Sequence, residues 1–480
     1  TRTVYGSKRL LGRTYYSDLA AELQRHFAYP LGEAEGQRFG ACVDDRVISM
    51  DTIAARVLDD VRSTAEAHLG QPVDAAVITV PAYFSDVQRE AVRRAAAQAN
   101  LAVHRIVNEP TAAAVAYGHK QSGAQSGAST GASRVAVWDL GGGTFDFSVV
   151  DLTDDRLEVI ATGGDNFIGG SDFDDLLASH LLAEFQRQEK IEIEPTPQQI
   201  ARLRAAAEQA KIMLSAEDET LVELPELTTS PKRALRVVVT RDLFERLARP
   251  LIEHTIAIAG EVLRSAGLEP TDVEDVVLVG GSTRVPAVQR AVGDFFQRRP
   301  SKRINPDEAV AHGAALLADE VGKAPVLLDI LPMSVGYGGA RRSFEPIVRR
   351  HTRLPAKREI TLDADVLGSV TVPLFQGDSS DVTQNEYLCT IVIEDRSLWD
   401  HGRARIRLSF DEHCIMAIEA YNARDGKPLP VRLDRTRPLE EVLRDLGAFE
   451  GPEVQAWSLP ETMLSRALGK LGSLFGRKRA

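Results

Sequence analysis

Asp139-Leu140-Gly141-Gly142-Gly143-Thr144-Phe145-Asp146 is the stretch of sequence that decides the fold. Apolar runs at 135–138 and 147–150 flank it, which predicts a strand, a tight glycine turn and a returning strand. Three adjacent glycines let the backbone take positive φ and turn successive N–H groups toward an anion such as phosphate. The two aspartates carry carboxylates of the kind that hold Mg²⁺ through its waters, and Thr144 adds a hydroxyl. The alternative is an ordinary hairpin with acidic shoulders.

Size and composition set the broad class of the protein. A chain of 480 residues is expected to form about two to four domains, and its 44% apolar and 26% charged content is that of a soluble globular protein. The net charge of −12 argues against nucleic acid as a partner. Three widely spaced cysteines, Cys42, Cys389 and Cys414, exclude a disulfide scaffold or a cysteine-based zinc site. Without a signal-peptide pattern or a transmembrane run, we expect a soluble, cytoplasmic protein.

The sequence before the glycine turn alternates between helix and strand patterns. Residues 51–68 have apolar positions at helical spacing, residues 75–80 form an apolar strand, and Ser85 with Gln88 predicts a capped helix. This order is typical of a doubly wound α/β layer.

Glu109 lies at a predicted corner between a strand and a helix. Pro110 is expected at the first helical position and Gly118 just beyond the helix end, before a flexible Gly/Ser/Ala loop at 121–133. At such a corner the carboxylate can point into a cleft or simply complement the helix dipole, and both interpretations stay open.

Two later segments have features of a nucleotide site. A second glycine-rich loop, 163–172, precedes a helix. Thr196-Pro197-Gln198-Gln199 then begins a helix on which Glu208, Lys211 and Ser215 share one polar stripe. That stripe is either solvated surface or a wall that hydrogen-bonds a ribose or purine.

A second strand and glycine turn occur at 276–286. The apolar strand 276–279 runs into Gly280-Gly281-Ser282-Thr283-Arg284, where the flat guanidinium of Arg284 can stack on a base. Asn305-Pro306-Asp307-Glu308-Ala309-Val310 begins the next helix. Taken alone, Gly-Gly-Ser is a weak signal.

The pattern changes to short alternating runs after Val326-Leu327-Leu328-Asp329. Runs at 359–362, 369–375, 388–393, 405–410 and 414–418 predict a separate antiparallel β domain. From about Pro438 the helical period returns and ends in a basic amphipathic segment at 464–479. We expect that segment to pack on the β domain rather than on a membrane surface.

With these motifs in order, the chain resembles the heat shock protein 70 (DnaK) chaperone family over nearly its full length. The motifs that carry the resemblance are Val80-Pro81-Ala82-Tyr83-Phe84, Asn108–Ala114, Asp139–Asp146, Val279–Pro286 and Asn305–Val310. Residues 326–329 look like the interdomain linker of that family.

The resemblance implies an α/β actin-like ATPase with two ribonuclease-H-like lobes, then an all-β sandwich and a short helical tail. The implied parts are a nucleotide-binding domain at 1–322, a linker at 323–332, a substrate-binding β-sandwich at 333–435 and a tail at 436–480. Two departures stand out. The family's first phosphate loop would precede the first residue here, so we expect a truncated sequence and poor ATP hydrolysis by it alone. The alternative is a genuine short protein with altered nucleotide handling. After residue 435 too few residues remain for the family's long helical lid.

The site residues follow by resemblance to the family motifs. Lys8, Glu109, Asp139 and Asp146 are the implied catalytic residues, and Glu109 and Asp139 would hold Mg²⁺ through water. The implied nucleotide contacts are Gly141, Gly142, Gly143, Thr144, Glu208, Lys211, Ser215, Gly280, Gly281, Ser282, Thr283, Arg284 and Asp307. The implied allosteric relay is Pro81, Arg89, Leu327, Leu328 and Asp329. The implied peptide pocket is Tyr337, Ala340, Ile360 and Val370, which could equally be ordinary sandwich core.

By this resemblance the protein is an ATP-dependent molecular chaperone of protein folding and the stress response. ATP and Mg²⁺ are its implied cofactors, and hydrolysis would be coupled to affinity for unfolded polypeptides. A J-domain co-chaperone and a nucleotide-exchange factor are further implied partners. Two alternatives remain: a non-catalytic, nucleotide-dependent scaffold or regulator, and a small-molecule kinase of the actin fold.

Overall fold

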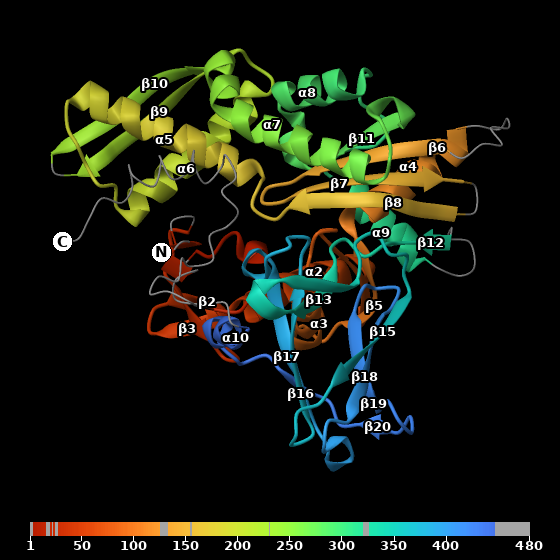
Figure 1. Ribbon diagram of the computed structural model, residues 1–480. Helices are drawn as coiled ribbons and strands as arrows, with labels where there is room; N and C mark the ends of the chain where they lie inside the picture. Colours follow the sequence, from red (N-terminus) through yellow and green to blue (C-terminus); the bar gives the residue numbers. More distant parts are fainter. Residues whose placement is uncertain are drawn as a thin grey trace.

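A mixed α/β part and an antiparallel β-sandwich make up the chain in the computed structural model (Figure 1). The structure describes residues 3–15, 20–21, 23–24, 27–124, 133–153, 156–229, 231–319 and 326–446, without the side chains of 120–124 and 340. The basic segment predicted near the C-terminus lies outside these residues, as does the start of the predicted linker. Among the described residues, no helix has the length and apolar character needed to cross a membrane.

A five-stranded mixed sheet in the order β11-β6-β7-β8-β12 is the centre of the α/β part. Its strands are β6 (Ser133–Leu140), β7 (Phe145–Leu152), β8 (Arg156–Asp165), β11 (Asp275–Val279) and β12 (Val326–Leu328). β6, β7 and β8 are antiparallel neighbours, whereas β11 runs parallel to β6 and β12 parallel to β8. Trp138, Phe145 and Phe147 are fully buried in the apolar cluster on one side of this sheet.

Helices and a hairpin complete this part, and Figure 1 shows α5 to α8 together with the sheet in its upper half. The elements are α4 (Glu109–Ala124), α5 (Gly170–Glu189), α6 (Pro197–Leu214), β9 (Glu219–Thr229), β10 (Lys232–Thr240), α7 (Arg241–Ser265), η3 (Pro270–Asp272), η4 (Gly281–Arg284), α8 (Pro286–Phe296) and α9 (Ala309–Ala318). The predicted start of α6 is confirmed, because Thr196 and Gln199 form a capping box and Pro197 is the first helical residue.

The N-terminal elements form smaller sheets with their own apolar cluster. They are η1 (Ser7–Arg9), β1 (Leu31–Ala34), β2 (Arg38–Val43), β3 (Arg46–Ser49), α2 (Met50–Leu69), β4 (Ala75–Val80), α3 (Asp86–Gln98) and β5 (Ala102–Asn108). β4 and β5 are parallel, with α3 between them in the chain, and the capping box of Ser85 and Gln88 begins α3 as predicted.

Two antiparallel sheets pack face to face in the β-sandwich. One has the order β14-β13-β16-β17-β21 and the other β15-β18-β19-β20, and both contribute to one apolar cluster. The elements are β13 (Val335–Gly338), η5 (Ala340–Arg342), β14 (Phe344–Val348), β15 (Ala356–Asp363), β16 (Ser369–Gln376), η6 (Val382–Gln384), β17 (Glu386–Glu394), η7 (Arg396–Leu398), β18 (Arg403–Phe410), β19 (Met416–Asn422), β20 (Pro428–Leu429), β21 (Arg432–Asp434) and α10 (Leu439–Asp445). The alternating runs therefore predicted the strands well.

Three local predictions were wrong. Gly118 does not end its helix, because α4 continues to Ala124, and the predicted loop at 121–133 begins with helical residues. Glycine disfavours a helix interior by roughly 1 kcal/mol, but α4 packs against α9, and that tertiary contact outweighs the preference. Gly163 and Gly164 belong to β8 and not to a loop. A Cβ on either would lie within 2.6 Å of a neighbouring atom, so close packing explains these glycines.

Candidate functional site

Lys8 and Glu109 form an ion pair that joins the N-terminal segment to α4. Lys8 Nζ lies 2.7 Å from Glu109 Oε1. Burial acts to lower the pKa of Lys8, but the charges of Glu109, Asp139 and Asp146 outweigh it and raise the pKa above its ordinary value. The Lys8 side chain keeps 47% of its surface exposed, so a cation is held beside three carboxylates and stays accessible to a ligand.

Asp139 and Asp146 face each other across β6 and β7, where the register pairs them directly. Burial, and then the charges of Glu109 and Asp146, raise the pKa of Asp139 well above its ordinary value. Burial and the charge of Glu109 raise the pKa of Asp146 to about 7. The backbone N–H of Tyr83 donates to Asp146 Oδ1 over 3.1 Å, whereas the buried Oδ2 has no hydrogen-bond partner among the described residues.

This group of carboxylates fits a divalent cation held through water. Three acids share one lysine, and one buried carboxylate oxygen is left without a partner, so added positive charge is favourable there. Within the described part of the chain, no three His, Cys, Asp or Glu side chains lie close enough to hold a metal directly. Mg²⁺ keeps several of its waters when a protein binds it, so these carboxylates would hold it through hydrogen bonds to those waters.

Three glycine loops pack against one another beside these acids. The carbonyl of Gly141 accepts hydrogen bonds from the Gly170 N–H (2.9 Å) and from Ser282 Oγ (2.8 Å). A Cβ on Gly280, where φ is +84°, would lie 2.4 Å from the Leu140 carbonyl oxygen. A Cβ on Gly142 would meet no atom of the described residues within 4 Å, so the backbone there borders open space in that part of the structure. The structure thus brings the predicted phosphate loop and the Gly280 loop together.

The remaining predicted nucleotide residues surround these loops. Lys211 Nζ lies 2.8 Å from Asp174 Oδ1 and donates to the Gly170 carbonyl over 3.1 Å, so Lys211 also supports the second loop. Ser215 Oγ donates to the Lys211 carbonyl, and Glu208 is exposed one turn before Lys211. Thr144 and Thr283 are buried at the loop ends.

Arg284 lies on the outer side of the Gly280 loop and pairs with Asp307. Arg284 Nη2 lies 2.5 Å from Asp307 Oδ2, and both side chains are about half exposed. The same guanidinium donates to Asn305 Oδ1 over 3.2 Å. One face of the guanidinium plane can therefore stack on a base while the edge is held.

Arg9 lies beside the candidate site and was missed by sequence reasoning, because an arginine next to Lys8 is ordinarily solvated surface. Arg9 Nη2 lies 2.5 Å from Asp172 Oδ2, and Arg9 Nε donates to the Gly143 carbonyl over 2.9 Å. Both side chains are buried, and Asp172 also accepts from the Gly169 N–H over 2.8 Å. Burial raises the pKa of Asp172, although the Arg9 charge acts against that rise. Arg9 thus connects the N-terminal segment to the loops that contain Gly143 and Gly169. In the sequence Arg9 looks like a surface cation, because its buried partner Asp172 is known only from the structure.

The predicted relay residues form a buried chain of hydrogen bonds that reaches the linker. Arg89 Nη2 donates to Asn108 Oδ1 over 2.7 Å, and Asn108 Nδ2 donates to Asp329 Oδ2 over 2.9 Å. Thr111 Oγ1 also donates to Asp329 Oδ2 over 3.2 Å. Burial raises the pKa of Asp329. Pro81 is buried between β4 and α3, and Leu327 and Leu328 pair with β8.

The β-sandwich contacts the α/β part next to this chain. The Asp86 N–H donates to Gln376 Oε1 over 3.0 Å, and the Met416 N–H donates to Asp86 Oδ1 over 2.9 Å. His351 Nε2 lies 3.1 Å from the Thr162 carbonyl oxygen. Sequence reasoning missed Asp86, which directly follows the predicted cap residue Ser85.

The four predicted peptide-pocket residues have different surroundings. Val370 is 4% exposed in the sandwich core, and Tyr337 and Ile360 are partly buried against the same cluster. The Ala340 side chain lies outside the described residues.

One comparison with known proteins bears on this arrangement. A protein-family model described as "Hsp70 protein" matches residues 1–442.

Proposed function

The chain belongs to the Hsp70 family, and from that premise we propose that it is an ATP-dependent chaperone whose hydrolysis of ATP controls its affinity for unfolded polypeptide. The observation that carries the proposal is the Lys8–Glu109 pair beside the facing carboxylates of Asp139 and Asp146. A lysine, a carboxylate cluster and glycine loops together are the set of groups that hydrolysis of a phosphoanhydride requires.

Hydrolysis of a phosphoanhydride depends on positioning and charge neutralisation more than on covalent help. In the proposed site, Gly142, Gly143 and Thr144 donate to phosphate oxygens, and Lys8 neutralises charge that develops on the terminal phosphate. Glu109 and Asp139 would orient the attacking water, and the same two carboxylates would hold Mg²⁺ through its waters. Bound Mg²⁺ would supply further charge neutralisation.

The adenosine half of the nucleotide is proposed to lie between α6 and the Gly280 loop. Glu208, Lys211 and Ser215 would border the ribose, and Arg284, held by Asp307, would stack on the base. Arg9 binds no ligand in this proposal, because its guanidinium is used by Asp172 and Gly143.

The proposed coupling to peptide binding runs through consecutive residues. Asn108 contacts Asp329 of the linker, and its neighbour Glu109 contacts Lys8 of the site. A change at the terminal phosphate that moves Glu109 would alter the linker contact, and with it the docking of the β-sandwich through Asp86. The sandwich would bind extended apolar segments near Tyr337, Ala340, Ile360 and Val370. A J-domain co-chaperone and a nucleotide-exchange factor remain proposed partners.

The proposed compartment is the cytoplasm. All three cysteines are free thiols, which is in keeping with a reducing environment.

The test measures two quantities on the full-length protein. ATP turnover is measured with and without an unfolded peptide, and the affinity for that peptide is measured with ATP, with ADP and without nucleotide. The chaperone proposal expects turnover, and weaker peptide binding with ATP than with ADP. Equal peptide affinity in all three states would overturn it. Nucleotide binding without turnover would favour a scaffold, and phosphate transfer to a sugar or acetate would favour a kinase.

A further inference from the structure

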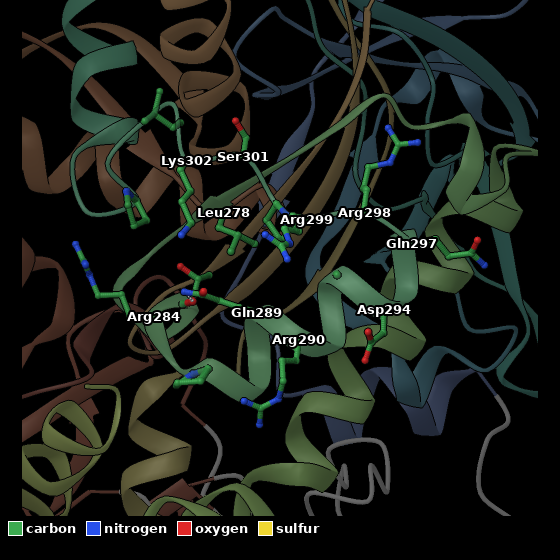
Figure 2. Close-up of a pocket in the computed structure, with 16 residues that line it drawn as sticks. Leu278, Arg284, Gln289, Arg290, Asp294, Gln297, Arg298, Arg299, Ser301 and Lys302 are labelled. Atoms are coloured by element: carbon green, nitrogen blue, oxygen red, sulfur yellow. Dashed lines mark hydrogen bonds between the residues drawn. The ribbon is translucent and has the colours of Figure 1, made fainter. Parts of the chain in front are cut away.

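A groove of about 1010 Å³ lies on the α/β part between α8 and the segment 297–306 that follows it (Figure 2). We call it the α8 groove. The residues that line it are Leu278, Thr283, Arg284, Pro286, Gln289, Arg290, Gly293, Asp294, Gln297, Arg298, Arg299, Pro300, Ser301, Lys302, Ile304 and Pro306. Its volume is at the upper end of the range for small-molecule sites.

The α8 groove is separate from the proposed nucleotide site. Of the proposed nucleotide-site residues, Thr283 and Arg284 also line the α8 groove. Lys211, Gly281 and Asp307 do not line it. Gln289 Nε2 donates to the Thr283 carbonyl over 3.0 Å, so the groove wall supports the nucleotide loop from behind.

The lining of the α8 groove is strongly basic in a chain of net charge −12. Its charged members are Arg284, Arg290, Arg298, Arg299 and Lys302 against the single carboxylate of Asp294.

Three of the five cations already have partners. Arg284 pairs with Asp307, Arg290 pairs with Glu245, and Arg298 Nη1 donates to the Glu274 carbonyl. Within the described part of the chain, Arg299 and Lys302 have neither an ion pair nor a side-chain hydrogen bond, and both are exposed.

Apolar residues line the groove near these two free cations. Leu278 and Ile304 are nearly buried, at 9% and 6% exposed, whereas Pro300 is partly exposed. In the view of Figure 2, Arg299 and Lys302 lie to either side of Leu278, with the Gln289 amide below them.

We propose that the α8 groove binds a small organic anion with a phosphate or carboxylate head and an apolar or planar body. The planar fork of Arg299 can hold two anionic oxygens at once, and Lys302 adds a point charge on the same head group. The body of the ligand lies on the partly exposed ring of Pro300 and on the small exposed parts of Leu278 and Ile304, where it displaces water from apolar surface.

An acidic peptide fits the α8 groove less well. Peptides that add to a sheet need an open strand edge. Here the Ser301 N–H donates to the Val276 carbonyl over 2.7 Å, and Ser301 forms a bridge with Val277, so the outer edge of β11 is already covered.

The test uses phenyl phosphate as the probe, with inorganic phosphate and phenol as its two halves. Binding to the full chain is measured by calorimetry with and without saturating ADP and Mg²⁺, because ADP would displace any probe bound at the phosphate loop. The variant Arg299→Gln/Lys302→Gln removes the two free cations. Its matched control, Arg246→Gln/Arg249→Gln, removes two exposed cations with the same spacing from α7, outside the groove.

We expect phenyl phosphate to bind more tightly than either half, whether or not ADP is present. The Arg299→Gln/Lys302→Gln variant should weaken that binding by about tenfold or more, and the control should leave it unchanged. The proposal is overturned by equal binding to both variants, by loss of binding with ADP, or by no binding at all. Tighter binding of an acidic decapeptide would also overturn it in favour of a protein partner. None of these results depends on ATP turnover, so the proposed function stands or falls separately.

Discussion

Asn108 donates a hydrogen bond to Asp329 over 2.9 Å, and so the last residue of β5 holds the residue that directly follows β12 in the linker. The next residue in the chain is Glu109, which pairs with Lys8 over 2.7 Å. The linker contact and the proposed catalytic pair are therefore one peptide bond apart. No long pathway is needed to couple them, since any rotation of that peptide moves both.

Replacing Asp329 tests this connection. Asp329→Ala removes the acceptor for Asn108 and Thr111, and each hydrogen bond to a buried charged group contributes roughly 1.5–3 kcal/mol. We expect the linker to undock, which is measured as faster proteolysis near residues 326–329, and we expect unfolded peptide to stop changing the rate of ATP turnover. Asp319→Ala, at an exposed aspartate of the same part of the chain, is the control. A linker that stays protected in Asp329→Ala would contradict the coupling.

Lys8→Ala should abolish turnover and spare nucleotide binding. Removing one well-placed electrostatic donor costs about 10²–10³ in rate, whereas nucleotide binding in the proposed site would rely mainly on the glycine loops and the adenosine wall. Single-turnover hydrolysis and ADP affinity are the two measurements. Lys190→Ala, at an exposed lysine beyond α5, controls for loss of charge. Hydrolysis near the wild-type rate in Lys8→Ala would remove Lys8 from the mechanism.

Two glycine substitutions should separate the phosphate cradle from the packing of the loops. A Cβ on Gly142 meets no atom within 4 Å, so Gly142→Ala should leave urea unfolding unchanged while weakening ATP binding, because the methyl group enters the proposed phosphate space. A Cβ on Gly169 would lie 2.4 Å from the Gly143 nitrogen, so Gly169→Ala should lower the free energy of unfolding as well. Equal ATP affinity in Gly142→Ala and wild type would place the phosphates elsewhere.

The buried pair of Arg9 and Asp172 should contribute to stability through both partners together. Arg9→Met leaves the Asp172 carboxylate buried without its cation, and breaking such a pair costs about 3–5 kcal/mol. The double variant Arg9→Met/Asp172→Asn should recover part of that loss, and urea unfolding of the four proteins in the cycle measures it. If the two single losses simply add, the residues do not act as a pair.

Docking of the β-sandwich should depend on pH through Asp86. Burial first, with a smaller contribution from the charge of Glu90, raises the pKa of Asp86 to about 6, from an ordinary value of 3.8. The Met416 N–H and the charges of Arg435 and Arg89 act in the opposite direction.

Because the pKa of Asp86 is higher in the docked state, protonation of its carboxyl group favours docking. This contribution is complete below pH 3.8 and is lost as the pH rises through about 6. Asp86→Asn keeps the acceptor for Met416 and carries no charge, so it should dock at pH 7 at least as tightly as the wild type. Small-angle scattering between pH 5 and 8 measures the docked fraction. Undocking of Asp86→Asn at pH 7, or an unchanged pH dependence, would contradict this assignment.

The sequence alone determined the local elements that short-range rules govern. The strand-turn-strand around Gly141–Gly143, the capped starts at Ser85 and Thr196, and the alternating strands of the sandwich depend on neighbours only a few residues away. The structure has them where they were predicted. The predicted helix end at Gly118 and the predicted loop at Gly163 and Gly164 were wrong, because contacts with distant segments fix those backbones and local preference does not.

The tertiary structure decided which residues meet. Arg9 reaches Asp172 across 163 positions of sequence, and Asp86 meets Met416 across 330. Rules based on residue spacing cannot predict contacts over such sequence separations, because these contacts depend on how the domains pack together. An arginine that looks like solvated surface in the sequence therefore became buried only when a distant aspartate folded onto it. The role of a buried charged side chain depends on the residue it pairs with. That residue can be distant in the sequence, so only the tertiary structure identifies it.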